Sequence, residues 1–263
     1  MSVVVVKLGG HALDGATDLE HTLDMLASDL ASLANSGTHV VLVHGAGPQI
    51  SELLTTLGIP VSFVDGLRVT DAATMNVVAM SLGLVNQQLV LGLQRRQVRA
   101  VGLSGVDAGM VTATSKGERW QRAGDVTHVD TSYLSHVLAQ GFLPVVSPVS
   151  ASVSGELMNC NADAVAGALA AAVRADALVL LSDVDRLRRD PDDPNSAVAS
   201  ATVEDVEALM ASGAIRDGMT PKMHAALTAV TAGARRVVLA NGTRPGALAN
   251  ALSDARTGTE ITA

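Results

Sequence analysis

Short runs of β-branched residues alternate along this chain with amphipathic stretches of helical length. This rhythm is typical of βαβ units, in which a helix returns the chain so that two strands can lie parallel. We therefore predict an α/β fold with a mainly parallel sheet. The expected strands are residues 3–7, 39–43, 61–64, 98–103, 142–146, 177–181 and 235–239, and the expected helices are residues 17–35, 48–57, 71–97, 131–140, 163–173, 203–211, 221–232 and 245–252.

Some segments depart from this rhythm. Residues 109–129 hold short alternating runs with Gly117 and Gly124, which predicts a β-hairpin excursion. Residues 186–196 hold charges and two prolines, which predicts a loop. Gly83 predicts a break in the long helix that starts after Asp71. We expect two lobes, residues 1–173 and 174–263.

The composition argues against several classes of function. The formal charge is −8, no block is rich in lysine, and the four aromatic residues offer little for bases to stack on, so we expect no nucleic-acid partner. No apolar run reaches the roughly 20 residues that a membrane helix needs. The N-terminal residues also lack the pattern of a signal peptide. Cys160 is the only cysteine, so no disulfide can form within one chain, and a reducing cytoplasm is the expected location.

Lysine is rare in this sequence, whereas arginine is common. Of 18 basic residues only Lys7, Lys116 and Lys222 are lysines. Lys7 and Lys222 both fall in glycine-containing motifs, where a compact charge on a flexible stem has a use that arginine does not share. Lys222 also stands in the first turn of an expected helix, where a cation is unfavourable unless an anion lies nearby.

Two glycine turns follow the first two expected strands. Lys7-Leu8-Gly9-Gly10 ends one strand and His44-Gly45-Ala46-Gly47 ends the other. Such turns let backbone N–H groups approach an anion, although glycine can also serve only to make a tight turn. A dinucleotide fingerprint is a weaker reading of the second turn, because Pro48 follows it and Ile50 replaces the third glycine.

Three further clusters of polar residues are candidates for a site. Arg68 precedes a helix and can bind a carboxylate with both arms of its guanidinium, or pair with Asp65 or Asp71. Asn159-Cys160-Asn161-Ala162-Asp163 can orient a substrate, or Asp163 can cap the following helix. Ser182-Asp183-Val184-Asp185 is either a solvated turn or part of a nucleotide loop. His11 and His44 neighbour the glycine turns, and the other histidines show no metal-ligand spacing, so surface or packing roles are the default expectation.

Taken together and in order, these motifs resemble those of the acetylglutamate kinases, within the amino acid kinase family, from the first strand to the last helix. The stretches that carry the resemblance are Lys7-Leu8-Gly9-Gly10, Val43-His44-Gly45-Ala46-Gly47-Pro48, Gly66-Leu67-Arg68-Val69-Thr70-Asp71, Leu157-Met158-Asn159-Cys160-Asn161-Ala162-Asp163, Leu180-Leu181-Ser182-Asp183-Val184 and Asp217-Gly218-Met219 with Lys222.

The resemblance implies a three-layer αβα sandwich, with an N-terminal lobe for N-acetyl-L-glutamate and dimerisation and a C-terminal lobe for ATP. It implies that Lys7 and Lys222 stabilise the transition state and that Asp163 orients them. The residues implied for the acyl substrate are Gly9, Gly10, Gly45, Ala46, Gly47, Arg68, Asn159 and Asn161. Those implied for ATP are Lys7, Gly9, Ser182, Asp183, Val184, Leu187, Ala214, Ile215, Arg216, Met219 and Lys222. The expected cofactor is Mg²⁺, held mainly by the nucleotide and not by a protein ligand set.

Two departures from the family pattern leave the substrate open. Ala46 stands where the family usually has glycine, and Asp65 stands where it commonly has asparagine. Related kinases act on glutamate or aminoadipate attached to an acidic carrier protein, and the basic hairpin at 116–122 is a candidate docking surface for such a carrier. A non-catalytic ligand-binding protein is the alternative of another class. Because the chain begins directly at its first strand, the resemblance implies a homodimer without arginine feedback.

Overall fold

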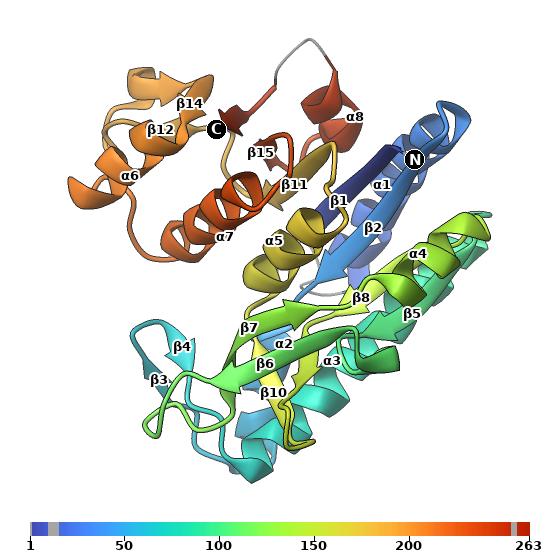
Figure 1. Ribbon diagram of the computed structural model, residues 1–263, viewed down its shortest axis with the longest axis vertical. Coiled ribbons are helices and arrows are strands. Elements are labelled where there is room, and N and C mark those ends of the chain that lie inside the picture. Colours follow the sequence, from blue (N-terminus) through green and yellow to red (C-terminus); the bar gives the residue numbers. More distant parts are fainter. Residues whose placement is uncertain (1, 10–15, 254–256) are drawn as a thin grey trace.

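The computed structural model describes residues 2–9, 16–253 and 257–263, and it is built around one eight-stranded sheet (Figure 1). Six neighbouring strands run parallel and alternate with helices along the chain, which confirms the predicted fold class. In order across the sheet the strands are β14 (Ser200–Thr202), β16 (Thr259–Thr262), β15 (Val237–Asn241), β11 (Ala177–Ser182), β1 (Ser2–Leu8), β2 (Thr38–His44), β8 (Leu143–Ser147) and β5 (Ala100–Ser104). Only β16 and its partner β14 run against the others, since β16 pairs antiparallel with β15.

Helices cover both faces of this sheet, which gives the three layers. The side chains of β1 alternate between two apolar clusters, with Val3 and Val5 in one and Val4 and Val6 in the other. Four helices pack on the Val4 side: α1 (Ala16–Asn35), α2 (Gly47–Thr56), α3 (Ala72–Arg95) and α8 (Ala247–Leu252). Four others pack on the Val3 side: α4 (Ser132–Ala139), α5 (Ala162–Ala172), α6 (Val203–Ala211) and α7 (Met219–Thr231).

The predicted hairpin at 109–129 is confirmed and belongs to a small closed barrel. Strands β6 (Val111–Ser115) and β7 (Ala123–Val129) pair antiparallel, and β9 (Val149–Ala151) and β10 (Leu157–Cys160), which the sequence pattern did not reveal, close the barrel. The strand predicted at 61–64 is wrong as a member of the main sheet. Only β3 (Phe63–Val64) forms, and it pairs with β4 (Leu67–Arg68) in a separate two-residue hairpin.

Helix α3 differs from its prediction in two ways. It is continuous through Gly83, because one glycine costs a helix only about 1 kcal/mol and the packed face on either side outweighs that. The expectation that no stretch has the length of a membrane helix is also wrong, since α3 meets that criterion by length and composition. Half of its most apolar window is buried inside the protein, and a core helix passes the same test.

The other predicted strands and helices form with small shifts in their bounds. The segment 186–196 is largely a loop but contains β12 (Leu187–Arg188), which pairs with β13 (Ala197–Val198), and a 3-10 turn at Pro194–Ser196. The C-terminal elements α6, α7 and β14 gather at one end of the molecule, and the hairpins β3–β4 and β6–β7 lie toward the other (Figure 1). The sheet is continuous across the junction at 173–174, where α5 leads into β11.

Candidate active site

The two glycine turns lie side by side at one edge of the sheet. Strands β1 and β2 are parallel neighbours in register from Ser2 opposite Thr38 to Leu8 opposite His44, so both turns open at the same carboxyl edge. Neither packing nor backbone conformation demands glycine at two of these positions. A side chain at Gly47 would meet no atom within 4 Å, and one at Gly45 would make only an ordinary 3.7 Å contact. The absence of side chains there therefore leaves open space, which favours a ligand site over a tight turn.

Asp163 joins the two lysines that the sequence singled out. Its carboxylate lies 2.9 Å from Lys7 Nζ and 3.9 Å from Lys222 Nζ, and the side chains of Lys7 and Asp163 are each only 7% exposed. The residues come from three separate elements, the end of β1, the first turn of α5 and the first turn of α7. Two cations and one anion leave this buried cluster with a net positive charge, which suits an anionic ligand.

The pKa of Lys222 is shifted by its neighbours in this cluster. Burial lowers its pKa, Asp163 opposes that lowering, and the positive charge of Lys7 adds to it. Lys222 Nζ also donates a 3.2 Å hydrogen bond to the carbonyl of Gly218, which fixes the side chain back along its own helix. The pattern is typical of a functional site, where a partly desolvated cation is held ready for a charge that the protein does not itself supply.

One cavity, which we call the glycine-turn pocket, opens beside Lys7 and Asp163. It brings together most of the residues predicted for the acyl substrate. Its lining includes Gly45, Ala46, Gly47, Arg68, Asn159 and Asn161, together with Lys7 and Asp163. Gly9 lies outside it and donates its N–H to Leu181, and Gly10 falls outside the described residues.

Arg68 is prepared to bind an anion in this pocket. The ion pairs with Asp65 or Asp71 that the sequence left open are not how the guanidinium is held. Nη2 donates to the Gly47 carbonyl at 3.2 Å and to Ser51 Oγ at 2.9 Å, and the group stacks on the ring of Phe63. Nη1 is buried and has no hydrogen-bond partner among the described residues. A buried guanidinium nitrogen without an acceptor is costly, and a bound carboxylate would satisfy it.

The two asparagines have different tasks. Asn161 Oδ1 accepts hydrogen bonds from the backbone N–H groups of Asp163 and Ala164, so Asn161 caps α5. The alternative in which Asp163 is the cap is therefore wrong, and its carboxylate is free for the lysines. Asn159 Nδ2 donates to Thr70 Oγ1 at 3.0 Å, which fixes this amide at the pocket wall.

A second cavity, the loop pocket, collects most residues predicted for the nucleotide. Its lining includes Asp183, Val184, Leu187, Ala214, Arg216 and Met219. Five predicted residues lie elsewhere, among them Lys7 in the glycine-turn pocket and Gly9 and Lys222 in the apolar cavity described below. Ile215 is 6% exposed and packs in the core, so it supports the loop from below. Ser182 lines a third cavity instead, and its hydroxyl accepts from the N–H of Val184.

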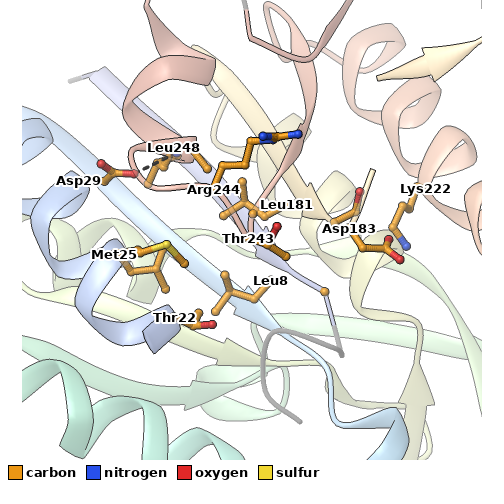
Figure 2. A pocket seen from close by; sticks show the side chains of 15 residues that line it. Leu8, Thr22, Met25, Asp29, Leu181, Asp183, Lys222, Thr243, Arg244 and Leu248 are labelled. Atoms are coloured by element: carbon orange, nitrogen blue, oxygen red, sulfur yellow. Dashed lines mark hydrogen bonds between the residues drawn. The ribbon is translucent and has the colours of Figure 1, made fainter. Parts of the chain in front are cut away.

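That third cavity is mainly apolar and adjoins the lysine cluster. Figure 2 shows Leu8, Met25 and Leu181 around it, with Lys222 and Asp183 at one side. Beside it lies an ion pair that the sequence did not reveal, which we call the Asp185–Arg244 latch. Arg244 binds both carboxylate oxygens of Asp185 at 2.7 and 2.8 Å, and Asn241 donates to the same carboxylate. These bonds lower the pKa of Asp185 to about 2. Because 59 residues separate Asp185 from Arg244, no local motif could have indicated the pair.

Among the described residues, no group of three or more histidine, cysteine or acidic side chains converges to hold a metal ion. Asp183 is the acidic residue shared by the loop pocket and the apolar cavity beside Lys222.

Comparison with known proteins identifies the family of this chain. The sequence model of the amino acid kinase family matches residues 2–241. The chain belongs to the amino acid kinase family. An acetylglutamate kinase of Symbiobacterium thermophilum is 42% identical over 255 residues, which are 93% of this chain and 86% of that protein.

Solved structures agree with the family assignment. The protein smu.665 of Streptococcus mutans superposes with a TM-score of 0.83 at 29% identity, covering 99% of this chain and 98% of that one. A carbamate kinase of Giardia lamblia bound to AMP-PNP superposes with a TM-score of 0.74 at 17% identity, covering 99% and 98% of the two chains. The latter likeness shows the shared fold. Members of this family are kinases, so the buried lysine cluster belongs to an enzyme that uses ATP.

Proposed function

We propose that this enzyme transfers the γ-phosphoryl group of ATP to the side-chain carboxylate of N-acetyl-L-glutamate, forming N-acetyl-L-glutamyl 5-phosphate in arginine biosynthesis. The observation that carries the proposal is the position of the lysine cluster. Lys7 and Asp163 line the glycine-turn pocket. Lys222 and Asp183 line the apolar third cavity, and Asp183 also lines the loop pocket that we assign to the nucleotide. Asp163 therefore lies between the sites proposed for the two substrates. Relatives at about 42% identity over most of the chain bear the name acetylglutamate kinase.

The chemistry explains why two lysines and no histidine are needed. The attacking carboxylate is already ionised near neutral pH, so no general base has to remove a proton. Its oxygen forms a bond to the γ-phosphorus while the bond to the bridging oxygen of ADP breaks. The obstacle is repulsion between two anions and the charge spread over the transferring phosphoryl oxygens. Positive charge fixed before reaction reduces that obstacle.

The residue roles follow from placement. Lys7 and Lys222 neutralise charge on the transferring group, and Asp163 holds both ammonium groups in position. Arg68 and Asn159 bind the α-carboxylate end of the acyl substrate, and the orphan Nη1 of Arg68 supplies the free donor. We assign the acyl substrate to residues 1–173 and the nucleotide to residues 174–263. Magnesium enters with ATP and is held mainly by its phosphates.

The charges on the β6–β7 hairpin favour a free acid over an acid on a carrier protein. Each basic residue that was a candidate for carrier docking already has an acidic partner. Lys116 pairs with Asp125, Arg119 with Asp65 at 3.4 Å, and Arg122 with Glu156 at 3.3 Å. The hairpin therefore offers an acidic carrier no surplus of positive charge. Trp120 also turns inward and donates to the Val64 carbonyl.

The apolar outer face of α3 supports the proposal of a homodimer. Residues 72–94 contain no charged side chain, although much of this helix faces outward. Met80, Leu84 and Leu91 recur on one side and are 55%, 57% and 61% exposed. An apolar stripe of this length is costly in water, and a second copy of the same helix would cover it. A cytoplasmic location stays a prediction from the sequence.

Trapping the product tests the proposal. The enzyme is incubated with MgATP, N-acetyl-L-glutamate and hydroxylamine, which converts an acyl phosphate into a coloured hydroxamate. We expect hydroxamate formation that depends on both substrates. Activity only with a carrier-bound amino acid would replace the free acid as substrate, and activity with neither would restore the non-catalytic alternative.

A further inference from the structure

His44 is a fully buried polar residue directly before the second glycine turn. It is the last residue of β2, and its side chain has no exposed surface. Both ring nitrogens have partners. Nδ1 lies 3.1 Å from the carbonyl oxygen of Gly45, and Nε2 lies 3.0 Å from Nδ2 of Asn86 on α3. The expectation of a surface or plain packing role therefore does not account for this histidine.

The partners define which nitrogen carries the proton. A carbonyl oxygen can only accept, so Nδ1 must donate to Gly45. Asn86 Nδ2 also lies 2.8 Å from the carbonyl oxygen of Val145 and 3.3 Å from that of Leu103. Only the amide nitrogen, with its two hydrogens, can face these acceptors, so Nε2 of His44 accepts from it. The imidazole is thus neutral. Burial lowers the pKa of His44 to about 4, against a smaller opposing effect of the Gly45 hydrogen bond, which agrees with that assignment.

The backbone makes room for this arrangement. A side chain on Gly102 of β5 would lie 2.2 Å from Asn86 Oδ1, so the absence of a side chain there lets the amide sit against the strand. Asn86 is then anchored to backbone carbonyls of β5 and β8, both of which are strands of the main sheet. Asn86 therefore holds the imidazole of His44 in a fixed position against the sheet.

The hydrogen bond to Gly45 has a consequence for the substrate pocket. In a planar trans peptide the C=O and the next N–H point in opposite directions. Fixing the Gly45 carbonyl on His44 therefore directs the N–H of Ala46 away from His44.

We propose that His44 and Asn86 are positioning residues that hold the Gly45–Ala46 peptide with its N–H presented to the acyl substrate. This inference rests on the proposed function of the glycine-turn pocket. It adds that substrate affinity depends on two hydrogen-bonded residues outside the pocket, which we call the His44–Asn86 relay. Neither His44 nor Asn86 is among the residues that line that pocket.

Steady-state kinetics of four variants test the proposal. His44→Phe keeps the ring but removes both hydrogen bonds, and Asn86→Ala removes the support of the ring. His44→Asn places an amide nitrogen near the position of Nδ1 and keeps the bond to Gly45. Ser81→Ala is the matched control, because Ser81 is a buried polar residue of the same helix whose hydroxyl has no hydrogen-bond partner among the described residues.

For His44→Phe we expect the KM for N-acetylglutamate to rise about ten-fold, with the KM for ATP within about two-fold, since one hydrogen bond of about 1.4 kcal/mol corresponds to ten-fold. Asn86→Ala is expected to raise the same KM about three- to ten-fold. His44→Asn should recover most of the affinity, and Ser81→Ala should match the wild type.

A lower melting temperature with an unchanged acyl KM in His44→Phe, or in Asn86→Ala if His44→Phe does not fold, would show a merely structural role and overturn the proposal. An equal rise in both KM values would also overturn it. Hydroxamate formation by the wild type is read separately, so failure of the proposed function is distinguishable from failure of the relay.

Discussion

Replacing Asp163 by asparagine tests the electrostatics of the lysine cluster most directly. The substitution keeps the shape of the side chain but removes the one negative charge that faces both Lys7 and Lys222. At an effective dielectric constant of about 20, charges separated by 2.9 and 3.9 Å attract by roughly 6 and 4 kcal/mol before desolvation is counted. Without Asp163, two ammonium groups would share a buried site, and the more weakly coupled Asp183 would be left to oppose the charge of Lys222. Removing one partner of a buried ion pair in this way is strongly destabilising.

Loss of a proton from Lys222 limits how far Asp163→Asn can lower the free energy of unfolding. Burial and Lys7 already lower the pKa of Lys222 from its ordinary 10.5, and Asp163 is the main opposing group. In the variant, Lys222 can shed its proton, at a cost of about 1.4 kcal/mol per pH unit below 10.5. At about pH 8 the limit is 10.5 − 8 = 2.5 units, or roughly 3.5 kcal/mol. At about pH 9.5 it is one unit, or roughly 1.4 kcal/mol.

The sign of the pH effect follows from proton linkage. In the variant the unfolded chain binds more protons than the folded protein wherever Lys222 is neutral only in the folded state. Stability therefore rises with pH in that window. We expect Asp163→Asn to lower the free energy of unfolding by about 3 kcal/mol at about pH 8 and by about 1–2 kcal/mol at about pH 9.5.

Urea denaturation of wild type and variant at the two pH values measures this difference. Asp192→Asn is the matched control, because the same chemical change there affects an 87% exposed carboxylate that lies 3.6 Å from Arg216. An exposed pair of this kind contributes about 0–1 kcal/mol. If Asp163→Asn costs no more than the control, or costs the same at both pH values, the lysine cluster is not electrostatically coupled as described.

Four further outcomes follow from the same geometry. Lys222→Ala should lower the rate of hydroxamate formation by about 10²–10³ with little change in ATP affinity, and equal losses in both would make Lys222 a nucleotide anchor only. Arg68→Lys should raise the KM for N-acetylglutamate by about 10- to 100-fold and leave the KM for ATP unchanged, because an ammonium lacks the planar fork; an unchanged acyl KM would remove Arg68 from the site. Arg244→Ala should free the loop that carries Asp185 and raise the KM for ATP several-fold. High salt should raise the same KM in the wild type, because the ion pair is exposed. A KM for ATP that responds to neither change would show that the latch does not order the loop. Leu84→Glu should convert a dimer into a monomer by light scattering, and a wild type that is already monomeric would refute the α3 interface.

Much of the fold was predictable because local periodicity reports it. The parallel core strands, the helices between them and the β6–β7 hairpin all followed from residues close in sequence. The short strands β9, β10, β14 and β16 were missed, since segments of three or four residues carry too little pattern to stand out. The break predicted at Gly83 does not form, because a local propensity of about 1 kcal/mol is smaller than the packing that opposes it.

The sequence by itself singled out the residues that we propose carry the chemistry. Two rare lysines, the glycine turns and the asparagine–aspartate segment were visible as motifs. They indicated an anion site, and their resemblance to the acetylglutamate kinases implied a kinase. Each motif is set by a few neighbouring residues, so it survives without knowledge of the fold.

Only the tertiary structure decided how those motifs act together. It brought one carboxylate within 4 Å of both lysines from three separate elements, assigned the helix cap to Asn161 and so left Asp163 for the lysines. It also revealed the His44–Asn86 relay and the Asp185–Arg244 latch, whose partners lie 42 and 59 residues apart. Such pairs form because sheet register and helix packing fix distances that local sequence does not encode. Burial then decides which charges and hydrogen bonds are strong enough to matter.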